Sequence, residues 1–285
     1  MFFRANLIFA AAALAASPAA SAGASPPPAS PAADNGGIGD LLVAPTRLVL
    51  DGRKGAEIIL NNIGTEPATY RVSVEFRRMT ESGGLEDVAN PSERDRLAEE
   101  MIVYAPRRVT LAPREPQSIR IAARPGQNIA DGEYRVHLLF RAIPPATPVG
   151  AARPREQPQG ISFALTPVYG VTIPVIVRLG NLQVKADISN VRLDKRDGKP
   201  VVALDLSRQG DRSTYGEVRV LKAGVNNPIA VQRAVAVYTE VGKRQVSVPI
   251  EAGFAGDAHG PVTVQYVETF DDGSHTLAET QAVLR

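Results

Sequence analysis

Residues 69–76 read TYRVSVEF, and this stretch indicates the fold of the chain. Its apolar residues, from Tyr70 to Phe76, alternate strictly with polar ones. Successive side chains of a strand point to opposite faces, so this alternation is typical of a strand with one packed face and one exposed face. The stretch therefore predicts a half-buried β-strand.

Similar short apolar runs recur on both sides of this strand. They are LLVAP, RLVLDG, AEIILNN, IVYAP, RRVTLAP, QSIRIAARPG and DGEYRVHLLFRAIPP. Many short strands between turn residues favour an all-β sandwich over alternating strands and helices. One helix-like patch, NPSERDRLAEEM, interrupts the series, and Ser92 is placed to cap a short helix there.

The same pattern continues in the second half of the chain. Alternating runs there include LQVKADISNVRL, PVVALDLSR, YGEVRVLKAG and GPVTVQYVETF. The pairs Asp197-Gly198 and Asp272-Gly273 separate such runs, which is a strong hairpin signal. We therefore expect an all-β fold of two β-sandwich domains, residues 41–180 and 181–285.

The first 40 residues precede the strand pattern. Residues 1–22 combine a cationic start, the apolar run LIFAAAALAA and an Ala-Ser-Ala motif ending at Ala22, which is typical of a cleavable signal peptide. Residues 23–40 are rich in Pro, Ala, Ser and Gly and predict a flexible leader. The longest later apolar segment, residues 168–179, contains Gly170 and Pro174, so we expect no transmembrane helix.

Composition limits the classes of function. Hydrophobic residues make up 44% of the 285 residues, which is enough for a core, and the chain has no cysteine for a disulfide or a thiolate site. The 32 Lys and Arg against 30 Asp and Glu leave a net charge of +2. This charge is too small to indicate a nucleic-acid partner or an anionic membrane.

Residues with catalytic or metal-binding chemistry are scarce. The three histidines, His137, His259 and His275, are far apart in sequence, and we expect His137 to share an outward face with Arg135. The chain contains no HExxH, GxSxG, GxxxxGK[ST] or GxGxxG motif. We therefore expect no enzyme activity, no catalytic residue, no metal, no cofactor and no nucleotide partner.

The segment GISFALTPVYGVTIPVIVRLG, residues 160–180, changes its pattern in the middle. Its first half alternates, with Ile161, Phe163 and Leu165 on one face, and Pro167 and Tyr169 continue the same phase. Its second half is apolar on both faces and follows the pattern of a buried strand. The alternating apolar face either packs into the first domain's own core or binds another protein.

Arg47 is a second candidate binding residue. It lies in PTRLVLDG, on the face of its strand opposite Leu48 and Leu50. An arginine in this position either extends into solvent or grips an anion, because a guanidinium can bind a carboxylate through two hydrogen bonds. The residue alone does not distinguish these two readings.

These pieces, taken in order, resemble the periplasmic pilus-assembly chaperones of the chaperone–usher pathway. The resemblance rests on APTRLVLDG, LNNIGTEPATYRVSV, VTLAPREPQSIRI, DGEYRVHLLFRAIPP and ISFALTPVYGVTIPVIVR, and covers residues 41–180 closely. It implies two immunoglobulin-like domains in an L-shaped arrangement and a location in the periplasm. It also implies pilin subunits as clients and an outer-membrane usher that receives them.

The resemblance further implies how the client is held. Ile161, Phe163 and Leu165 would enter the groove that a pilin leaves open where it lacks its last strand, with Pro167 and Tyr169 extending the register. Whether the free protein self-associates through this exposed strand stays open.

Three other positions match functional residues of the family. Arg47 matches the arginine that holds the terminal carboxylate of the client, whereas the accompanying lysine falls on Pro174, which has no charge. Glu133 and Arg178 match members of an interdomain ion-pair network, and Glu268 is the acidic residue of the second domain nearest the third position.

Two other classes of function remain open. A secreted two-domain immunoglobulin-like adhesion or binding module would use its loops and would bury Phe163 in its own core. A secreted hydrolase or metalloprotein would need the histidines to converge with carboxylates.

Overall fold

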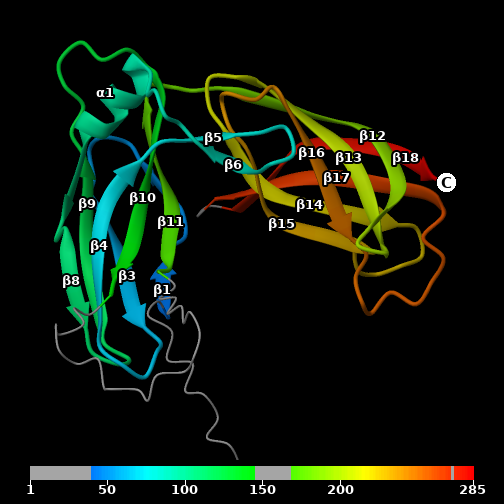
Figure 1. Cartoon of the computed structure of the whole chain (residues 1–285). Helices are drawn as coiled ribbons and strands as arrows, with labels where there is room; N and C mark the ends of the chain where they lie inside the picture. The colour runs from blue at the N-terminus through cyan, green and yellow to red at the C-terminus, as the bar shows by residue number, and fades with distance from the viewer. Residues whose placement is uncertain (1–39, 145–167, 271–272) are drawn as a thin grey trace, which may run out of the picture. The chain divides into compact units, whose positions relative to one another are not determined.

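The computed structural model of the chain describes residues 40–144, 168–270 and 273–285 (Figure 1). The described residues form eighteen strands and one helix, as the all-β prediction required. They belong to one compact unit, residues 36–285. No helix among them is long and apolar enough to cross a bilayer.

Residues 40–144 and 168–179 form the first group of strands. The strands are β1 (Leu41–Ala44), β2 (Leu48–Leu50), β3 (Ala56–Asn62), β4 (Ala68–Glu75), β5 (Arg77–Met79), β6 (Leu85–Asp87), β7 (Ile102–Ala105), β8 (Arg108–Leu111), β9 (Pro116–Ala123), β10 (Gly132–Ile143) and β11 (Gly170–Leu179). One sheet has the order β1-β3-β9-β7 and the other β2-β11-β10-β4-β8, and β5 and β6 form a separate hairpin.

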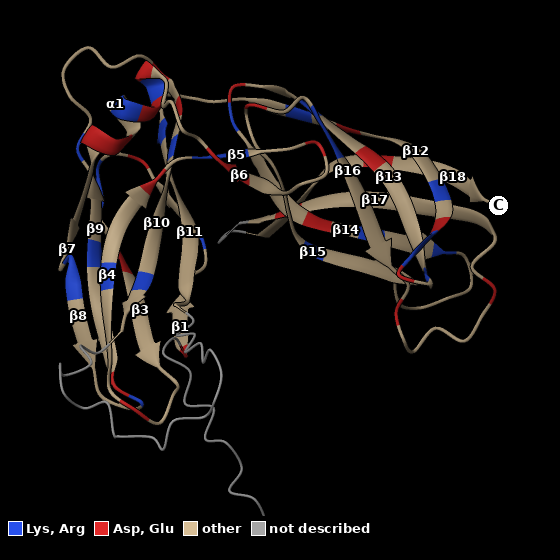
Figure 2. Cartoon of the chain, in the orientation of Figure 1, with Lys and Arg blue, Asp and Glu red and all other residues tan. Residues whose placement is uncertain are grey.

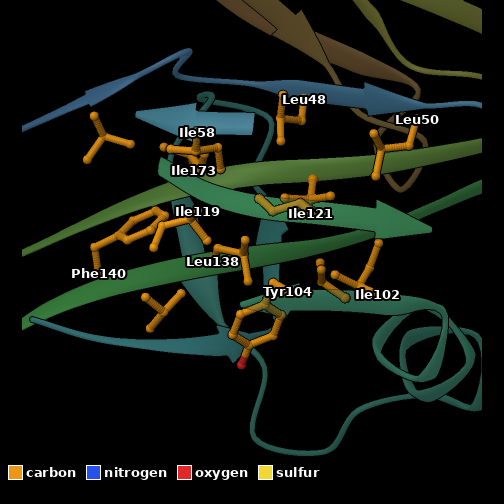
Figure 3. Packing of buried hydrophobic residues seen from close by; sticks show 14 of the residues in the cluster. Leu48, Leu50, Ile58, Ile102, Tyr104, Ile119, Ile121, Leu138, Phe140 and Ile173 are labelled. Atoms are coloured by element: carbon orange, nitrogen blue, oxygen red, sulfur yellow. The ribbon is translucent and has the colours of Figure 1, made fainter. Parts of the chain in front are cut away.

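The first core lies between these two larger sheets. Ile58 and Ile119 of one sheet pack against Leu138, Phe140 and Ile173 of the other, and all five are at most 2% exposed (Figure 3). Each buried side chain of this size contributes about 1.5–3 kcal/mol to folding. In the stretch TYRVSVEF, Tyr70 and Val72 are buried, and Val74 and Phe76 are half-buried against the same core, as the alternation predicts.

A single helix, α1 (Glu93–Met101), packs beside β10. Ser92 caps it as predicted, because its side chain accepts a hydrogen bond from Asp95 N while the Asp95 carboxylate accepts one from Ser92 N at 2.8 Å. This reciprocal pair satisfies two amides that the helix leaves unpaired. Ala98 and Met101 then fix the helix to the first core.

The second group of strands follows Gly180. The strands are β12 (Val184–Arg196), β13 (Lys199–Gly210), β14 (Thr214–Lys222), β15 (Ala230–Val237), β16 (Lys243–Pro249), β17 (Gly260–Phe270) and β18 (Gly273–Leu284). They form the sheets β12-β13-β16 and β15-β14-β17-β18 around a second core, in which Leu204, Val220 and Tyr266 are at most 1% exposed. The buried hydroxyl of Tyr266 donates to Val235 O at 2.8 Å.

One of the two predicted hairpin turns lies at its predicted position within the described residues. Arg196 pairs with Lys199, and the intervening Asp197 and Gly198 have φ angles of +51° and +75°. Positive φ at both positions is the geometry that Asp-Gly favours. At the other position, Phe270 pairs with Gly273, so Gly273 belongs to β18, and the residues between them lie outside the described ranges.

Gly180 connects β11 to β12 and therefore lies between the two cores. Its φ is +79°, and a Cβ at this position would lie 2.1 Å from Asp131 Oδ2. Glycine adopts such a φ without steric cost. Both the conformation and the close approach of Asp131 explain a glycine at this junction.

Candidate functional site

Strand β11 has a neighbouring strand on both sides over only part of its length. β10 pairs with all of Gly170–Leu179, whereas β2 pairs only with Val175–Val177, in parallel. Within the described residues, positions 170–174 are therefore bonded on one side only. A strand edge of this kind offers backbone N–H and C=O groups to another strand.

The free part of β11 ends in exposed apolar residues. Tyr169 is 54% and Val168 is 39% exposed, although the Ala142 amide donates to Tyr169 O at 3.0 Å and so extends the pairing with β10. Tyr169 is one of the two predicted register-extending residues. The others of the predicted strand, Ile161, Phe163, Leu165 and Pro167, lie outside the described residues.

The second half of the segment is buried on both faces. Val175 and Val177 point into the first core, while Ile176, on the opposite face, is also 0% exposed. The both-faces burial begins beyond the change of pattern at Tyr169-Gly170, in the same residues, Val175–Val177, that pair with β2.

Arg47 lies immediately before β2, and its side chain is packed rather than solvated. Its guanidinium carbon is 4.5 Å from the centroid of the Tyr215 ring. Its Nε and Nη2 atoms are buried, and no described residue accepts a hydrogen bond from them. Burial lowers the pKa of Arg47, and the positive charge of Arg178 lowers it further. Arg47 is therefore a half-buried cation with two buried donors that no described residue uses.

Glu133 and Arg178 form a pair across β10 and β11. Arg178 Nε lies 3.0 Å from Glu133 Oε2, and the glutamate is 3% exposed. Both the amide and the hydroxyl of Ser213 donate to the same carboxylate oxygen at 2.9 Å, while Arg178 Nη2 donates to Ser213 O at 2.9 Å. Ser213 thus links these two strands to the segment between β13 and β14.

The expected place of Glu268 in this network needs correction. Glu268 pairs instead with Arg212, whose Nη1 and Nη2 lie 3.0 and 2.9 Å from its two carboxylate oxygens. Arg212 Nη1 also donates to Ser213 O at 3.2 Å, so Glu268 joins the pair only indirectly. The third group at Glu133 is Ser213, whose amide and hydroxyl donate to Oε2, while Glu133 Oε1 is buried and has no hydrogen-bond partner among the described residues.

His137 shares the outer face of β10 with Arg135, as predicted, but this face is covered rather than exposed to solvent. His137 is 1% exposed and lies opposite Pro174 on β11 and Glu75 on β4, with its ring centroid 6.3 Å from that of Tyr238. Burial, followed by the positive charge of Arg135, lowers its pKa to about 3. The ring is therefore neutral near pH 7, and a residue from beyond Gly180 covers it.

Pro174, which the sequence resemblance aligns with a lysine of the pilus chaperones, lies on β11 opposite His137 of β10. β2 pairs Leu48 with Val175, which are the residues that follow Arg47 and Pro174 in the sequence. His137 Nε2 is buried and has no hydrogen-bond partner among the described residues.

Arg135 and its partners were not predicted. Its guanidinium stacks on Tyr238 at 3.8 Å and forms an ion pair with Glu240, which also accepts a hydrogen bond from Met79 N at 2.8 Å. Met79 is 7% exposed and packs with Ala236 and Tyr238. No local sequence signal identifies these contacts, because each joins residues more than 100 positions apart.

The other histidines do not converge with carboxylates into a metal site. His259 contacts Asp257 at 2.6 Å within one loop, and His275 is exposed. Within the described ranges, no group of three His, Asp or Glu side chains is arranged to hold a metal ion.

Neither a protein-family model nor a curated protein sequence matches the chain. Among solved structures, the YadV chaperone is 14% identical and aligns over 86% of this chain and 100% of its own, with a TM-score of 0.44. The CupB2 chaperone of Pseudomonas aeruginosa is 12% identical over 86% and 100%, also with a TM-score of 0.44. The CsuC–CsuE chaperone–tip subunit complex, from archaic chaperone–usher Csu pili of Acinetobacter baumannii, is 12% identical over 86% and 97%, with a TM-score of 0.42. Many of the similar structures are chaperones of chaperone–usher pili.

Proposed function

We propose that this chain is a non-enzymatic periplasmic chaperone that binds pilin subunits by lending them a strand and delivers them to an outer-membrane usher. The observation that carries the proposal is the half-covered strand β11, of which residues 170–174 have a strand neighbour on one side only among the described residues. The proposal extends this edge toward the N-terminus through residues 161–169, whose sequence alternates.

Strand donation has a sufficient driving force. Placing Ile161, Phe163 and Leu165 in an apolar client groove contributes about 1.5–3 kcal/mol for each side chain before ordering costs. Each backbone hydrogen bond along the client edge adds about 0.5–1.5 kcal/mol. These terms require no nucleotide, and the folding energy of the client would drive its later release.

Arg47 supplies a second point of attachment in this proposal. A half-buried cation with two buried donors that no described residue uses is costly, and a carboxylate offsets this cost through charge-assisted hydrogen bonds. We assign Arg47 to the terminal carboxylate of the client. Since Pro174 provides no charge, the chain would hold this carboxylate with Arg47 alone or with another basic residue.

The proposal includes the processing and division of the chain. Residues 1–22 would be removed as a signal peptide during export, and residues 23–40 would remain as a leader. The client-binding domain would be residues 41–180 and the second domain residues 181–285, with the boundary at Gly180 between the two cores.

A pair of variants on opposite faces of one strand tests the proposal. The chain is co-expressed in the periplasm with the pilin-like products of neighbouring genes, and complexes are purified through a tag on the chaperone. Phe163→Asp should abolish a 1:1 complex, whereas Ala164→Asp on the other face should retain it. Both variants should keep the wild-type Tm. A Phe163→Asp variant that still forms the complex would exclude strand donation in this register, and a large loss of Tm would favour the adhesion-module alternative.

A further inference from the structure

Three arginines lie side by side on the outer face of the sheet β2-β11-β10-β4-β8. Arg108 of β8 is directly opposite Arg71 of β4, and Arg71 is directly opposite Arg141 of β10. All three side chains are exposed. Figure 2 shows the corresponding blue bands at one level of β8, β4 and β10. We call Arg71, Arg108 and Arg141 the arginine row.

The positive charges of the arginine row are not balanced within the sheet. Directly opposite residues in paired strands have Cβ atoms about 4.5–5.5 Å apart, and like charges at this spacing repel. No carboxylate in the described part of the chain forms an ion pair with any of the three. Glu75, on the same face of β4, lies two rows away and pairs with Arg77 at 2.9 Å. The repulsion within the arginine row therefore costs free energy that no described contact offsets.

The neighbouring positions are small and polar. Thr69 and Thr110 form the next row on one side, with their hydroxyl oxygens 2.8 Å apart, and Ser73 follows Arg71 on the other. Surfaces that enter a membrane interface place large apolar or aromatic side chains beside their basic residues. Leu139 and Ile143, the apolar residues nearest the row on β10, are themselves half-buried. These features favour a flat polar contact with a protein over insertion into lipid.

We propose that the arginine row binds an acidic, extended segment of a protein partner. Strands in a sheet lie about 4.7–4.9 Å apart, so the row spans about 10 Å, and alternate side chains of an extended peptide lie about 6.8 Å apart. Two or three carboxylates on one face of such a peptide therefore reach the three guanidinium groups, each of which can form two parallel hydrogen bonds. The net charge of the chain is only +2, so the attraction is local to the row.

This surface is separate from the proposed strand-donating edge. The arginines point away from the first core, whereas the residues proposed for donation alternate in the sequence in phase with Ile173, which lies in that core. Arg141 lies opposite Gly170, so the row ends beside the free part of β11. A partner on the row and a strand on the edge would occupy different faces, and the proposal does not depend on strand donation.

Peptide binding to the mature protein tests the proposal. The probe is a fluorescent heptapeptide with glutamate at positions 2, 4 and 6 and serine elsewhere, and its matched control has glutamine at those positions. Anisotropy at low ionic strength should detect binding of the glutamate peptide only. The triple variant R71Q/R108Q/R141Q should weaken binding on the order of tenfold, since each exposed ion pair is worth little alone.

Two controls separate this proposal from its alternatives. R53Q/R120Q/R124Q removes the same charge from other exposed positions of the first group of strands and should change the affinity by less than about twofold. Equal weakening in both triple variants would overturn the proposal, because bulk charge would then explain binding. Binding to phosphatidylglycerol vesicles that depends on the row, without binding to the peptide, would also overturn it in favour of a membrane. A Tm of R71Q/R108Q/R141Q at or above that of the wild type would show that the weaker peptide binding is not due to unfolding.

Discussion

The guanidinium carbon of Arg47 lies 4.5 Å from the centroid of the Tyr215 ring. Stacking on an aromatic face compensates part of the cost of removing the cation from water. The Nε and Nη2 atoms nevertheless have no acceptor among the described residues. The contact thus stabilises the cation without satisfying these two donors.

Arg47→Met should weaken client capture without destabilising the protein. Loss of a charge-assisted hydrogen bond costs about 1.5–3 kcal/mol, or about 10- to 150-fold in affinity. The change should leave the Tm equal or raise it, because an unpaired half-buried charge is removed. A client with an amidated C-terminus is the control, and Arg47→Met should bind it as the wild type does. If the wild type and Arg47→Met bound the client with a free C-terminal carboxylate equally well, Arg47 would not be the residue that holds it.

Glu133→Gln should lower the free energy of unfolding by about 3 kcal/mol, because removing one partner of a buried ion pair leaves the other without a counter-charge. The affected groups are Arg178 and the two donors of Ser213. Urea denaturation measures the change. Glu57→Gln is the matched control, since Glu57 forms an exposed pair with Arg120 and should change stability by less than about 1 kcal/mol. Similar losses in both variants would show that the buried network is not stabilising.

His137 should make the protein less stable as the pH falls below about 6.5. The folded protein holds the pKa of His137 at about 3, whereas an unfolded chain protonates histidine near 6.5. The unfolded state therefore binds an extra proton between these values, and each pH unit costs up to about 1.4 kcal/mol. Between pH 6.5 and 4.5, the free energy of unfolding of His137→Leu should fall by about 2 kcal/mol less than that of the wild type. If the free energy of unfolding fell equally with pH in both proteins, His137 would not be the source of the acid sensitivity.

Local sequence signals predicted much of the fold. Alternation in TYRVSVEF identified β4, Ser92 identified the start of α1, and Asp197-Gly198 identified a hairpin, since each signal acts within a few residues. The apolar second half of residues 160–180 likewise predicted a buried strand, and Val175–Val177 are buried on both faces.

Contacts between distant segments could not be predicted in this way. His137 and Arg135 lie on the face of β10 that points away from the first core, and alternation alone assigns this face to solvent. Tyr238 and Glu240, about 100 residues later, cover it instead. The error over Glu268 has the same origin, because Ser213 supplies donors that have no signature in sequence.

Gly180→Ala should destabilise the protein more than Gly198→Ala. The two glycines have similar φ angles, +79° and +75°, so alanine at either position costs about 1–2 kcal/mol from backbone strain. Only at Gly180 would the new Cβ also collide with Asp131, at 2.1 Å, whereas no atom lies within 4 Å at Gly198. Thermal denaturation compares them, and equal Tm values would show that Asp131 moves away freely.

Hydrogen exchange of β11 with and without a bound pilin subunit tests the central proposal most directly. In the free protein, amides of Gly170–Ile173 that point away from β10 should exchange quickly, because this edge has no described partner. A client strand on the edge should slow them by at least about tenfold, while amides of Val175–Val177 should change little. Unchanged exchange at Gly170–Ile173 in a stable complex would show that the client binds elsewhere and would contradict strand donation.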